Sequence, residues 1–291
     1  MIPIKTIGVT AAIGLSIIGI ACTSQPQDSE SLNVLSFNIR YDNPSDGPNA
    51  WPHRQEFVAS LIQFHHADLV GVQEALVGQL SDLQGLLPLY SWFGVGRDDG
   101  EIAGEFTAIL YRKDKLTLQQ QGTFWCSPTP DVPSKGWDAD LNRTVTWGQF
   151  TRASGDNFYL FNTHFDHKGA ESRAECAQLI RRRIDMIANQ SPVIVTGDFN
   201  TTPADKPYQV LTDNTPYKHA LYDASRVSEL KPYGSNFTFT EFNIAAMGDA
   251  PIDYIFTSDS IKVRRFGVLS DSFNGRLPSD HYPLLAEINF P

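Results

Sequence analysis

Short apolar runs with the length of strands recur along the chain from residue 32 onward, separated by polar segments rich in Pro, Gly and Asn. The run at residues 193–197 (VIVTG) carries three β-branched apolar residues in succession, and residues 68–74 (DLVGVQE) are similarly apolar between their ends. A run without alternation is typical of a strand that is buried on both faces. Further strands are predicted at residues 32–40, 105–111, 115–120, 143–150, 157–163, 237–240, 251–256, 262–269 and 284–288.

Apolar residues at helical spacing predict a smaller number of helices between these strands. The clearest covers residues 170–189, where apolar residues recur every three or four positions on one stripe. A second is predicted to start at Pro52, and short helices are predicted at residues 78–87 and 204–211. The chain has 291 residues, without an internal repeat or a break in composition after the first strand. A single core is feasible at this length, so we predict one domain over residues 32–291.

The start of the chain has the pattern of a processing segment. A basic residue precedes an apolar stretch at residues 7–21, which is short for a transmembrane helix and is followed at once by polar residues. Residues 19–22 (GIAC) resemble a bacterial lipobox, although a Leu is usual where this chain has Gly. We therefore predict that residues 1–22 are a signal peptide ending at a lipidated Cys22, and that residues 23–31 are a polar tether. Plain secretion and an uncleaved anchor are the alternatives.

Charge and cysteine content exclude some functions and leave others open. The chain has 33 acidic and 23 basic residues and a formal net charge of −10, so a broad basic face for gripping long nucleic acid is not expected. Clustered acids that hold a cation would contribute to the same excess, which leaves phosphate chemistry open. A secreted chain permits a disulfide between Cys126 and Cys176, but the sequence does not show whether the two meet. No Cys and His spacing suggests a zinc site.

Polar side chains that could take part in catalysis or metal binding follow the predicted strands. Asp198 and Asn200 come directly after the strand at 193–197, and because residues i and i+2 of an extended segment point the same way, their side chains share one side. A carboxylate and a carboxamide at the end of a buried strand lie where α/β folds place their chemistry. Asp253 lies among bulky apolar residues, where a carboxylate must find a partner or stay uncharged. The strand ends together carry Asn38, Glu74, Glu105, His164, Asp198, Asn200, Asp253, Asp280 and His281.

Each of these residues alone has an ordinary structural explanation, but the set has a common chemistry. Carboxylates and amides without Cys suit a hard divalent ion, and the two His suit proton transfer. The segments that carry them also resemble, in order, the motifs of the endonuclease/exonuclease/phosphatase superfamily, which includes deoxyribonuclease I, inositol-polyphosphate 5-phosphatases and neutral sphingomyelinases. The matching segments are SFN (36–38), VQE (72–74), TH (163–164), GDFN (197–200), IDY (252–254) and SDHYP (279–283). The resemblance implies an α/β fold, a four-layer α/β/β/α sandwich of two packed, mixed and largely antiparallel sheets.

The resemblance also implies roles for the metal site and the phosphate site. Glu74 would be the principal metal ligand, with Asn38 and Asp280 nearby. Asp198 and Asn200 would orient the attacking water and the phosphate.

Proton transfer is implied for the two His. Asp253 would hydrogen-bond His281, while His164 would face the leaving oxygen as an acid. Glu105 lies where the deoxyribonuclease I branch has the Glu that pairs with this His, and Arg143 matches a phosphate-contacting Arg. Since a neighbouring carboxylate favours the charged imidazole, we expect both His to have a raised pKa.

Several positions are left without a single interpretation. Many base-excision members of the superfamily carry Asp two residues after the first-strand Asn, where this chain has Arg40, which weakens a function in repair of apurinic sites. His167 either binds substrate or is a loop residue. Three Trp side chains could stack on a base or a sugar or form the cores of loops; they are Trp51, Trp125 and Trp137. The loop at 125–142 is long enough to be functional or mobile.

Taken together, the residues and the resemblance predict a divalent-metal-dependent hydrolase of phosphoester bonds, acting as a phosphodiesterase or nuclease. A lipid, inositol or other small-molecule phosphoesterase is the alternative. An inactive binding module should have lost a ligand or a His, and no motif position is lost here. The expected cofactor is Mg²⁺, with Mn²⁺ or Ca²⁺ as alternatives. We expect a monomer of the cell envelope, lipid-anchored in the periplasm or outer membrane or secreted, that meets the membrane only through its anchor.

Overall fold

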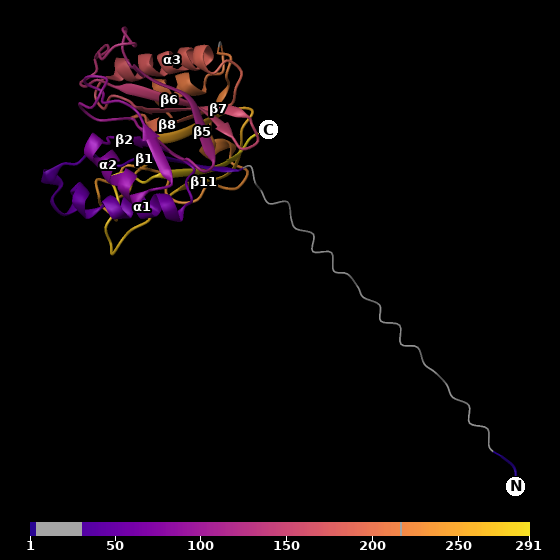
Figure 1. Cartoon of the computed structure of the whole chain (residues 1–291). Helices are drawn as coiled ribbons and strands as arrows, with labels where there is room; N and C mark the ends of the chain where they lie inside the picture. The colour runs from indigo at the N-terminus through magenta and orange to yellow at the C-terminus, as the bar shows by residue number, and fades with distance from the viewer. Residues whose placement is uncertain (4–30, 216) are drawn as a thin grey trace.

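The computed structural model describes residues 1–3, 31–215 and 217–291, and it folds into four layers (Figure 1). One sheet is covered by α3, the other sheet by α1 and α2, and the two sheets pack face to face. The predicted α/β/β/α sandwich of two mixed sheets is therefore confirmed. Of the predicted signal peptide and tether, only residues 1–3 and 31 belong to the described part, so both predictions stay untested. Among the described residues, no helix is both long and apolar enough to cross a bilayer.

The first sheet has the strand order β11-β12-β1-β2-β4-β3, in which β1 and β2 are parallel and the other neighbours antiparallel. Its strands are β1 (Leu32–Asn38), β2 (Leu69–Gln73), β3 (Tyr90–Phe93), β4 (Ile109–Arg112), β11 (Lys262–Val268) and β12 (Leu284–Asn289). The segments on its outer side are the 3-10 helices η1 (Pro44–Asn49) and η2 (Trp51–His53) and the helices α1 (Gln55–Phe64) and α2 (Val77–Leu86).

The second sheet has the order β5-β6-β7-β8-β10-β9, and again one central pair, β7 and β8, is parallel. Its strands are β5 (Leu116–Trp125), β6 (Thr144–Arg152), β7 (Asn157–His164), β8 (Val193–Asp198), β9 (Leu221–Asp223) and β10 (Asp253–Ser258). The associated helices are α3 (Ala170–Ile187), α4 (Lys206–Thr212) and α5 (Ala224–Val227).

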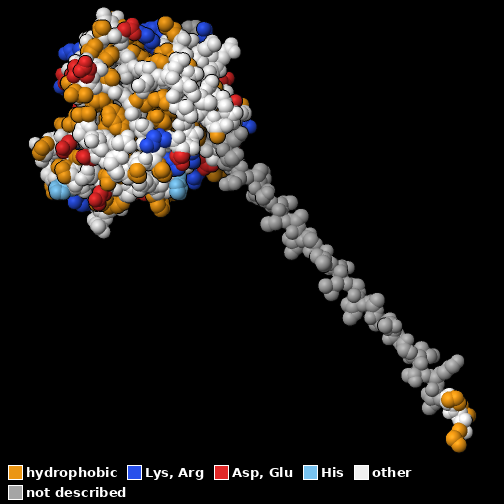
Figure 2. Space-filling view, in the orientation of Figure 1, with side chains coloured by type: hydrophobic (Ala, Val, Ile, Leu, Met, Phe, Trp, Pro, Cys, Tyr) orange, Lys and Arg blue, Asp and Glu red, His pale blue; other side chains and the backbone are white. Residues whose placement is uncertain are grey.

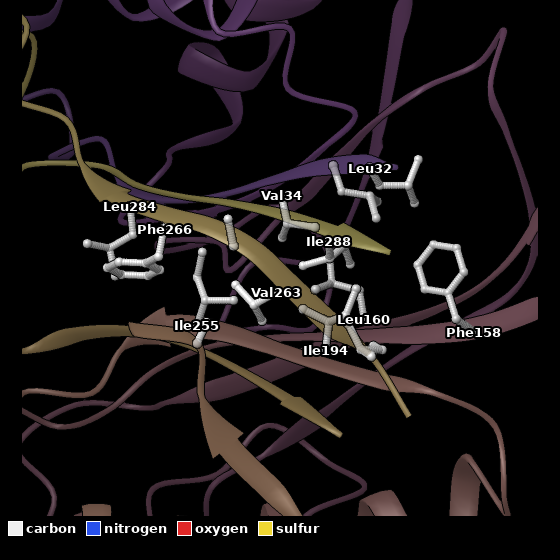
Figure 3. Packing of buried hydrophobic residues seen from close by; sticks show 14 of the residues in the cluster. Leu32, Val34, Phe158, Leu160, Ile194, Ile255, Val263, Phe266, Leu284 and Ile288 are labelled. Carbon is white, nitrogen blue, oxygen red and sulfur yellow. The ribbon is translucent and has the colours of Figure 1, made fainter. Parts of the chain in front are cut away.

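Three hydrophobic clusters separate the four layers. The cluster between the sheets combines side chains such as Val34 and Ile288 with Leu160 and Ile194 from the opposing sheet (Figure 3). The other two clusters join the first sheet to α1 and α2, and the second sheet to α3 and α4. Strands β2 and β8 contribute to the clusters on both of their faces, which explains why their sequences show no alternation. Full burial of each such side chain contributes about 1.5–3 kcal/mol.

Two predicted strands are wrong in part. The strand predicted at 105–111 begins at Ile109, and its first residues form only an isolated bridge between Ala75 and Phe106. The backbone of Glu105 instead accepts a hydrogen bond from the Arg97 amide of the preceding loop. The predicted strand at 237–240 is likewise reduced to a bridge between Phe239 and His281.

Cys126 and Cys176 form a disulfide, with their Cα atoms 5.0 Å apart, which answers the question that the sequence left open. The bond attaches the loop at 125–142 to α3. Beside it, the Trp125 indole is buried and donates to the Arg97 carbonyl at 2.7 Å, so this Trp forms the core of a loop. Trp51 is also buried, with its indole bonded to the Asp82 carboxylate at 2.8 Å.

Candidate active site

The predicted site residues meet at one end of the two sheets for a topological reason. The carboxyl ends of the parallel pairs β1/β2 and β7/β8 lie at this end. Strands β12 and β10 run antiparallel to β1 and β8, so their first residues arrive at the same end. A cavity of about 530 Å³ opens there. Eight predicted residues line it: Glu74, Glu105, Arg143, His164, Asp198, Asn200, Asp280 and His281.

Asn38 and Asp253, the two remaining predicted residues, lie behind the cavity wall and bond to residues of the lining. The Asn38 amide donates to Glu74 Oε1 and to Asp198 Oδ2, both at 3.0 Å, and thereby joins carboxylates of the two sheets. Its oxygen accepts the Arg40 amide at 3.0 Å. Asn38 therefore presents N–H groups to the carboxylates, which is the arrangement of a positioning group for Glu74 and Asp198.

His281 and Asp253 form the expected pair. The Nδ1 atom of His281 lies 2.9 Å from Asp253 Oδ2, its Nε2 atom lies 3.7 Å from Asp198 Oδ2, and all three side chains are buried. Burial by itself would lower the pKa of His281, but the carboxylates of Asp253 and Asp198 outweigh it and raise this pKa well above its ordinary value. Burial, together with the charge of Asp253, raises the pKa of Asp198 to about 7.

The environment of His164 differs from the expectation. Its Nε2 atom lies 3.2 Å from the Asn200 amide nitrogen and 3.4 Å from Asp198 Oδ2. The expected partner, Glu105, instead accepts a hydrogen bond from Arg97 Nη1 at 2.7 Å. Burial and the positive charges of Arg143 and Arg97 lower the pKa of His164 well below its ordinary value. The prediction of a raised His164 pKa was therefore wrong, and His164 is a neutral ring.

Arg143 is buried between two polar partners. Its Nε atom lies 3.3 Å from Asp166 Oδ2, and its Nη2 atom lies 3.0 Å from His167 Nδ1. His167, for which the sequence left two interpretations open, lines the cavity beside it. Arg143 therefore places a positive charge at the cavity wall. Its contact with a phosphate stays a prediction.

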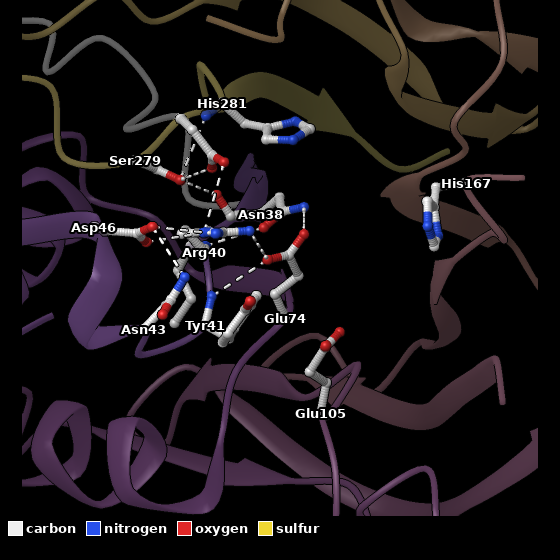
Figure 4. A network of polar contacts seen from close by, with 12 residues as sticks. Asn38, Arg40, Tyr41, Asn43, Asp46, Glu74, Glu105, His167, Ser279 and His281 are labelled. Atoms are coloured by element: carbon white, nitrogen blue, oxygen red, sulfur yellow. Dashed lines mark hydrogen bonds and ion pairs between the residues drawn. The ribbon is translucent and has the colours of Figure 1, made fainter. Parts of the chain in front are cut away.

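The sequence did not identify two other arginines of the cavity as site residues, Arg40 and Arg97. Arg40 lies two residues after Asn38, which ends β1. This closeness to a predicted site residue was the one feature of the sequence that could have identified Arg40. Arg97 lies in the loop between β3 and β4, where no pattern marked it. Figure 4 shows Arg40 among Asp46, Asn38 and Glu74, whereas Glu105 and His167 lie apart from this network.

A divalent ion has suitable donors in this cavity. The ligand atoms of Glu74, His164 and Asp198 lie within 4.8 Å of one another, and so do those of Asp198, Asp253 and His281. Carboxylate oxygens are the donors that magnesium and manganese prefer. Glu74 thus fits its predicted role, whereas Asp280 belongs to neither group.

Comparisons with known proteins agree with the fold. The model of the Endonuclease/Exonuclease/phosphatase family matches residues 31–281. A structure of an endonuclease/exonuclease/phosphatase family protein from Bacteroides thetaiotaomicron is 39% identical with a TM-score of 0.86, covering 90% of this chain and 98% of that one. The mannosyl-6-phosphatase of Bacteroides thetaiotaomicron VPI-5482 is also 39% identical, with a TM-score of 0.84, covering 89% of this chain and 100% of that one.

A more distant relative is the CCR4-Not complex 3'-5'-exoribonuclease subunit Ccr4 of Mycosarcoma maydis. It is 24% identical over 340 residues, a match that covers 89% of this chain but only 50% of the relative. The chain thus spans about half the length of this curated relative.

Proposed function

This chain belongs to the endonuclease/exonuclease/phosphatase family, and we propose that it is a divalent-metal-dependent hydrolase of phosphoester bonds. The observation that carries the proposal is the convergence of Glu74, Asp198 and the Asp253–His281 pair on one cavity, where Asn38 holds two of the carboxylates 3.0 Å from its own amide. Glu74 and Asp198 would hold the ion, which when bound supplies positive charge to a phosphate oxygen.

The chain's own residues account for the remaining steps of an in-line displacement. Water attacks phosphorus, the ester P–O bond breaks, and the leaving oxygen takes a proton. Without a bound ion, burial and the charge of Asp253 raise the pKa of Asp198, and this carboxylate is placed to orient the water and to take its proton. His281 is held as a cation by Asp253, and we assign the acid role to it. His164, a neutral ring, orients the Asn200 amide against the phosphate.

Two substrate classes have specific support. A phosphodiester of RNA is supported by the Ccr4 exoribonuclease relative, at 24% identity and over half of its length. A small phosphate monoester on a sugar is supported by the 39% identity to the mannosyl-6-phosphatase over its whole chain. The net charge of −10 favours the smaller substrate. On the face shown in Figure 2, basic side chains are scattered among acidic ones and form no broad basic area.

A phosphoester panel with the full chain tests the function. The substrates are DNA, RNA, sphingomyelin, inositol phosphates, mannose 6-phosphate and a chromogenic diester, each with Mg²⁺, with Mn²⁺ and with chelator. We expect hydrolysis that chelator stops and added metal restores. Hydrolysis that persists in chelator would contradict the metal dependence, and no hydrolysis of any substrate would favour the binding module.

Placement in the cell is a separate part of the proposal. We propose that the chain is a lipid-anchored monomer of the cell envelope, on the support of the lipobox-like residues 19–22 and the polar residues after them. Mass spectrometry of the membrane fraction should find a lipid on Cys22, and Cys22→Ser should release the protein. Light scattering of the released form tests the monomer.

A further inference from the structure

We propose that Arg40 is a built-in cation of the metal site, and that because of it the site takes one divalent ion and not two. The inference rests on the proposed function only in assuming that the cavity binds a divalent ion. The residue has no role in the mechanism described above. The inference is argued from the position of the Arg40 guanidinium, the hydrogen bonds that hold it in place, and its charge.

The guanidinium of Arg40 lies between two carboxylates of the site. Its Nη1 atom lies 3.7 Å from Glu74 Oε2, and its Nε atom lies 3.9 Å from Asp280 Oδ2. Figure 4 shows the group between Asp46 on one side and Glu74 on the other. Both distances exceed that of a normal hydrogen bond, so Arg40 offsets part of the negative charge of these two carboxylates without using up their lone pairs.

Arg40 makes its hydrogen bonds to Asp46 instead, and these bonds fix its side chain. Nε and Nη2 contact the two oxygens of Asp46 at 3.0 and 3.2 Å, a bidentate pair. The Asn43 amide donates to the same Asp46 carboxylate at 3.1 Å. Arg40 also stacks over the Tyr41 ring, with its guanidinium carbon 4.3 Å from the ring centre. The group is thus a stationary charge.

Hydrogen bonds with neighbouring side chains also hold the backbone of Arg40 in place. Its φ is 55°, in the left-handed region that a residue with a side chain rarely adopts. The Asn38 oxygen accepts its amide at 3.0 Å, and its carbonyl accepts from Arg54 Nη2 at 2.8 Å and from Gln79 Nε2 at 2.9 Å. Three side-chain contacts therefore hold an unfavourable conformation whose effect is to point Arg40 into the cavity.

These observations set the number of ions. In a two-metal site the ions lie about 3.5–4 Å apart and share carboxylates between them. Here the Glu74, His164 and Asp198 donors remain available for one ion. In the other donor group, which shares Asp198, the Asp253 and His281 side chains are bonded to each other at 2.9 Å. The space between Glu74 and Asp280 already contains a positive charge. A second dication there would meet like-charge repulsion at close range as well as the volume of the guanidinium.

The test counts bound Mn²⁺ on the full chain by calorimetry and electron paramagnetic resonance, without substrate. We expect one equivalent for the wild type and for Arg40→Lys, which keeps the charge. For Arg40→Gln we expect a second equivalent, because Glu74 and Asp280 then face the cavity without their cation and Asp46 beside them loses its partner. The matched control is Arg265→Gln, which removes an exposed Arg that also pairs with a carboxylate, and it should stay at one.

Two results would overturn the inference: two equivalents in the wild type, or one equivalent in Arg40→Gln with a normal cooperative thermal transition. If Arg40→Gln does not fold, the wild type and Arg40→Lys still decide, since two equivalents in either contradict the proposal. Zero equivalents in the wild type would instead refute the metal dependence of the proposed function itself, so the two failures are distinguishable.

Discussion

Replacing Asp253 by Asn should separate the charge of this side chain from its shape. Asp253 and His281 are 2% and 4% exposed and bonded at 2.9 Å, and the carboxylate is a main reason for the raised pKa of His281. An amide of the same size can still accept a hydrogen bond from Nδ1 but no longer stabilises the imidazolium. We therefore expect His281 in Asp253→Asn to lose its charge near neutral pH.

The magnitude follows from the loss of one buried charge-assisted hydrogen bond. Such bonds contribute about 1.5–3 kcal/mol, which corresponds to a fall of roughly 5 °C in Tm for a chain of this size. The effect on turnover should be larger, on the order of 10²–10⁴, because a general acid is lost while the fold is kept.

The Asp253–His281 pair also determines whether the stability of the fold rises or falls with pH. His281 has a folded pKa above its unfolded value of about 6.5, so its contribution is fully present below about pH 6.5 and is lost as the pH rises through the folded pKa. Asp198, whose pKa is raised to about 7, acts in the same direction, because its ionisation in the folded state is costly. Thermal unfolding with chelator should therefore show stability falling from pH 6 to 9, with a smaller fall in Asp253→Asn.

Asp156→Asn is the matched control, since it removes an exposed carboxylate that pairs with Arg152. It should leave turnover and the pH profile of stability unchanged. If Asp253→Asn turned over within threefold of the wild type and kept the same pH profile, the assignment of His281 as a cation held by Asp253 would be refuted.

Three further results are expected. Glu74→Gln should nearly abolish turnover and weaken metal binding, and calorimetry with unchanged Mg²⁺ affinity would count against Glu74 as a ligand. Gly71→Ala should destabilise the fold by about 1–3 kcal/mol in thermal or urea unfolding, because a Cβ there would collide with side chains of β7 and β8; Gly85→Ala, with open space around it on α2, should not destabilise. His281→Ala should lower turnover on the order of 10²–10⁴ through loss of the acid, and His164→Ala should lower it through loss of the Asn200 contact. The double variant should lose far less than the product, and near-normal turnover of folded His164→Ala would remove this residue from the mechanism.

The sequence by itself determined the sandwich and most of the predicted residues that meet at the cavity. Apolar runs without alternation identify β2 and β8 as central strands, because burial on both faces is a property of the strand itself. The polar residues that follow such strands, among them Glu74 and Asp198, could therefore be assigned to strand ends, and these lie at one end of the two sheets. The Asp253–His281 pair was predictable for another reason, because both residues lie in motifs that resemble those of a known family.

The tertiary structure alone decided which neighbour each side chain has. Glu105 has Arg97 as its partner instead of His164, since a loop with no periodic pattern brings that arginine into the cavity. Asn38 joins carboxylates that are 36 and 160 positions away in the chain, and the direction of Arg40 depends on a left-handed backbone and on contacts from three other segments. The hydrophobic pattern is local and fixes where a strand ends, whereas hydrogen-bond partners and pKa values depend on distances that exist only after the two sheets have packed together.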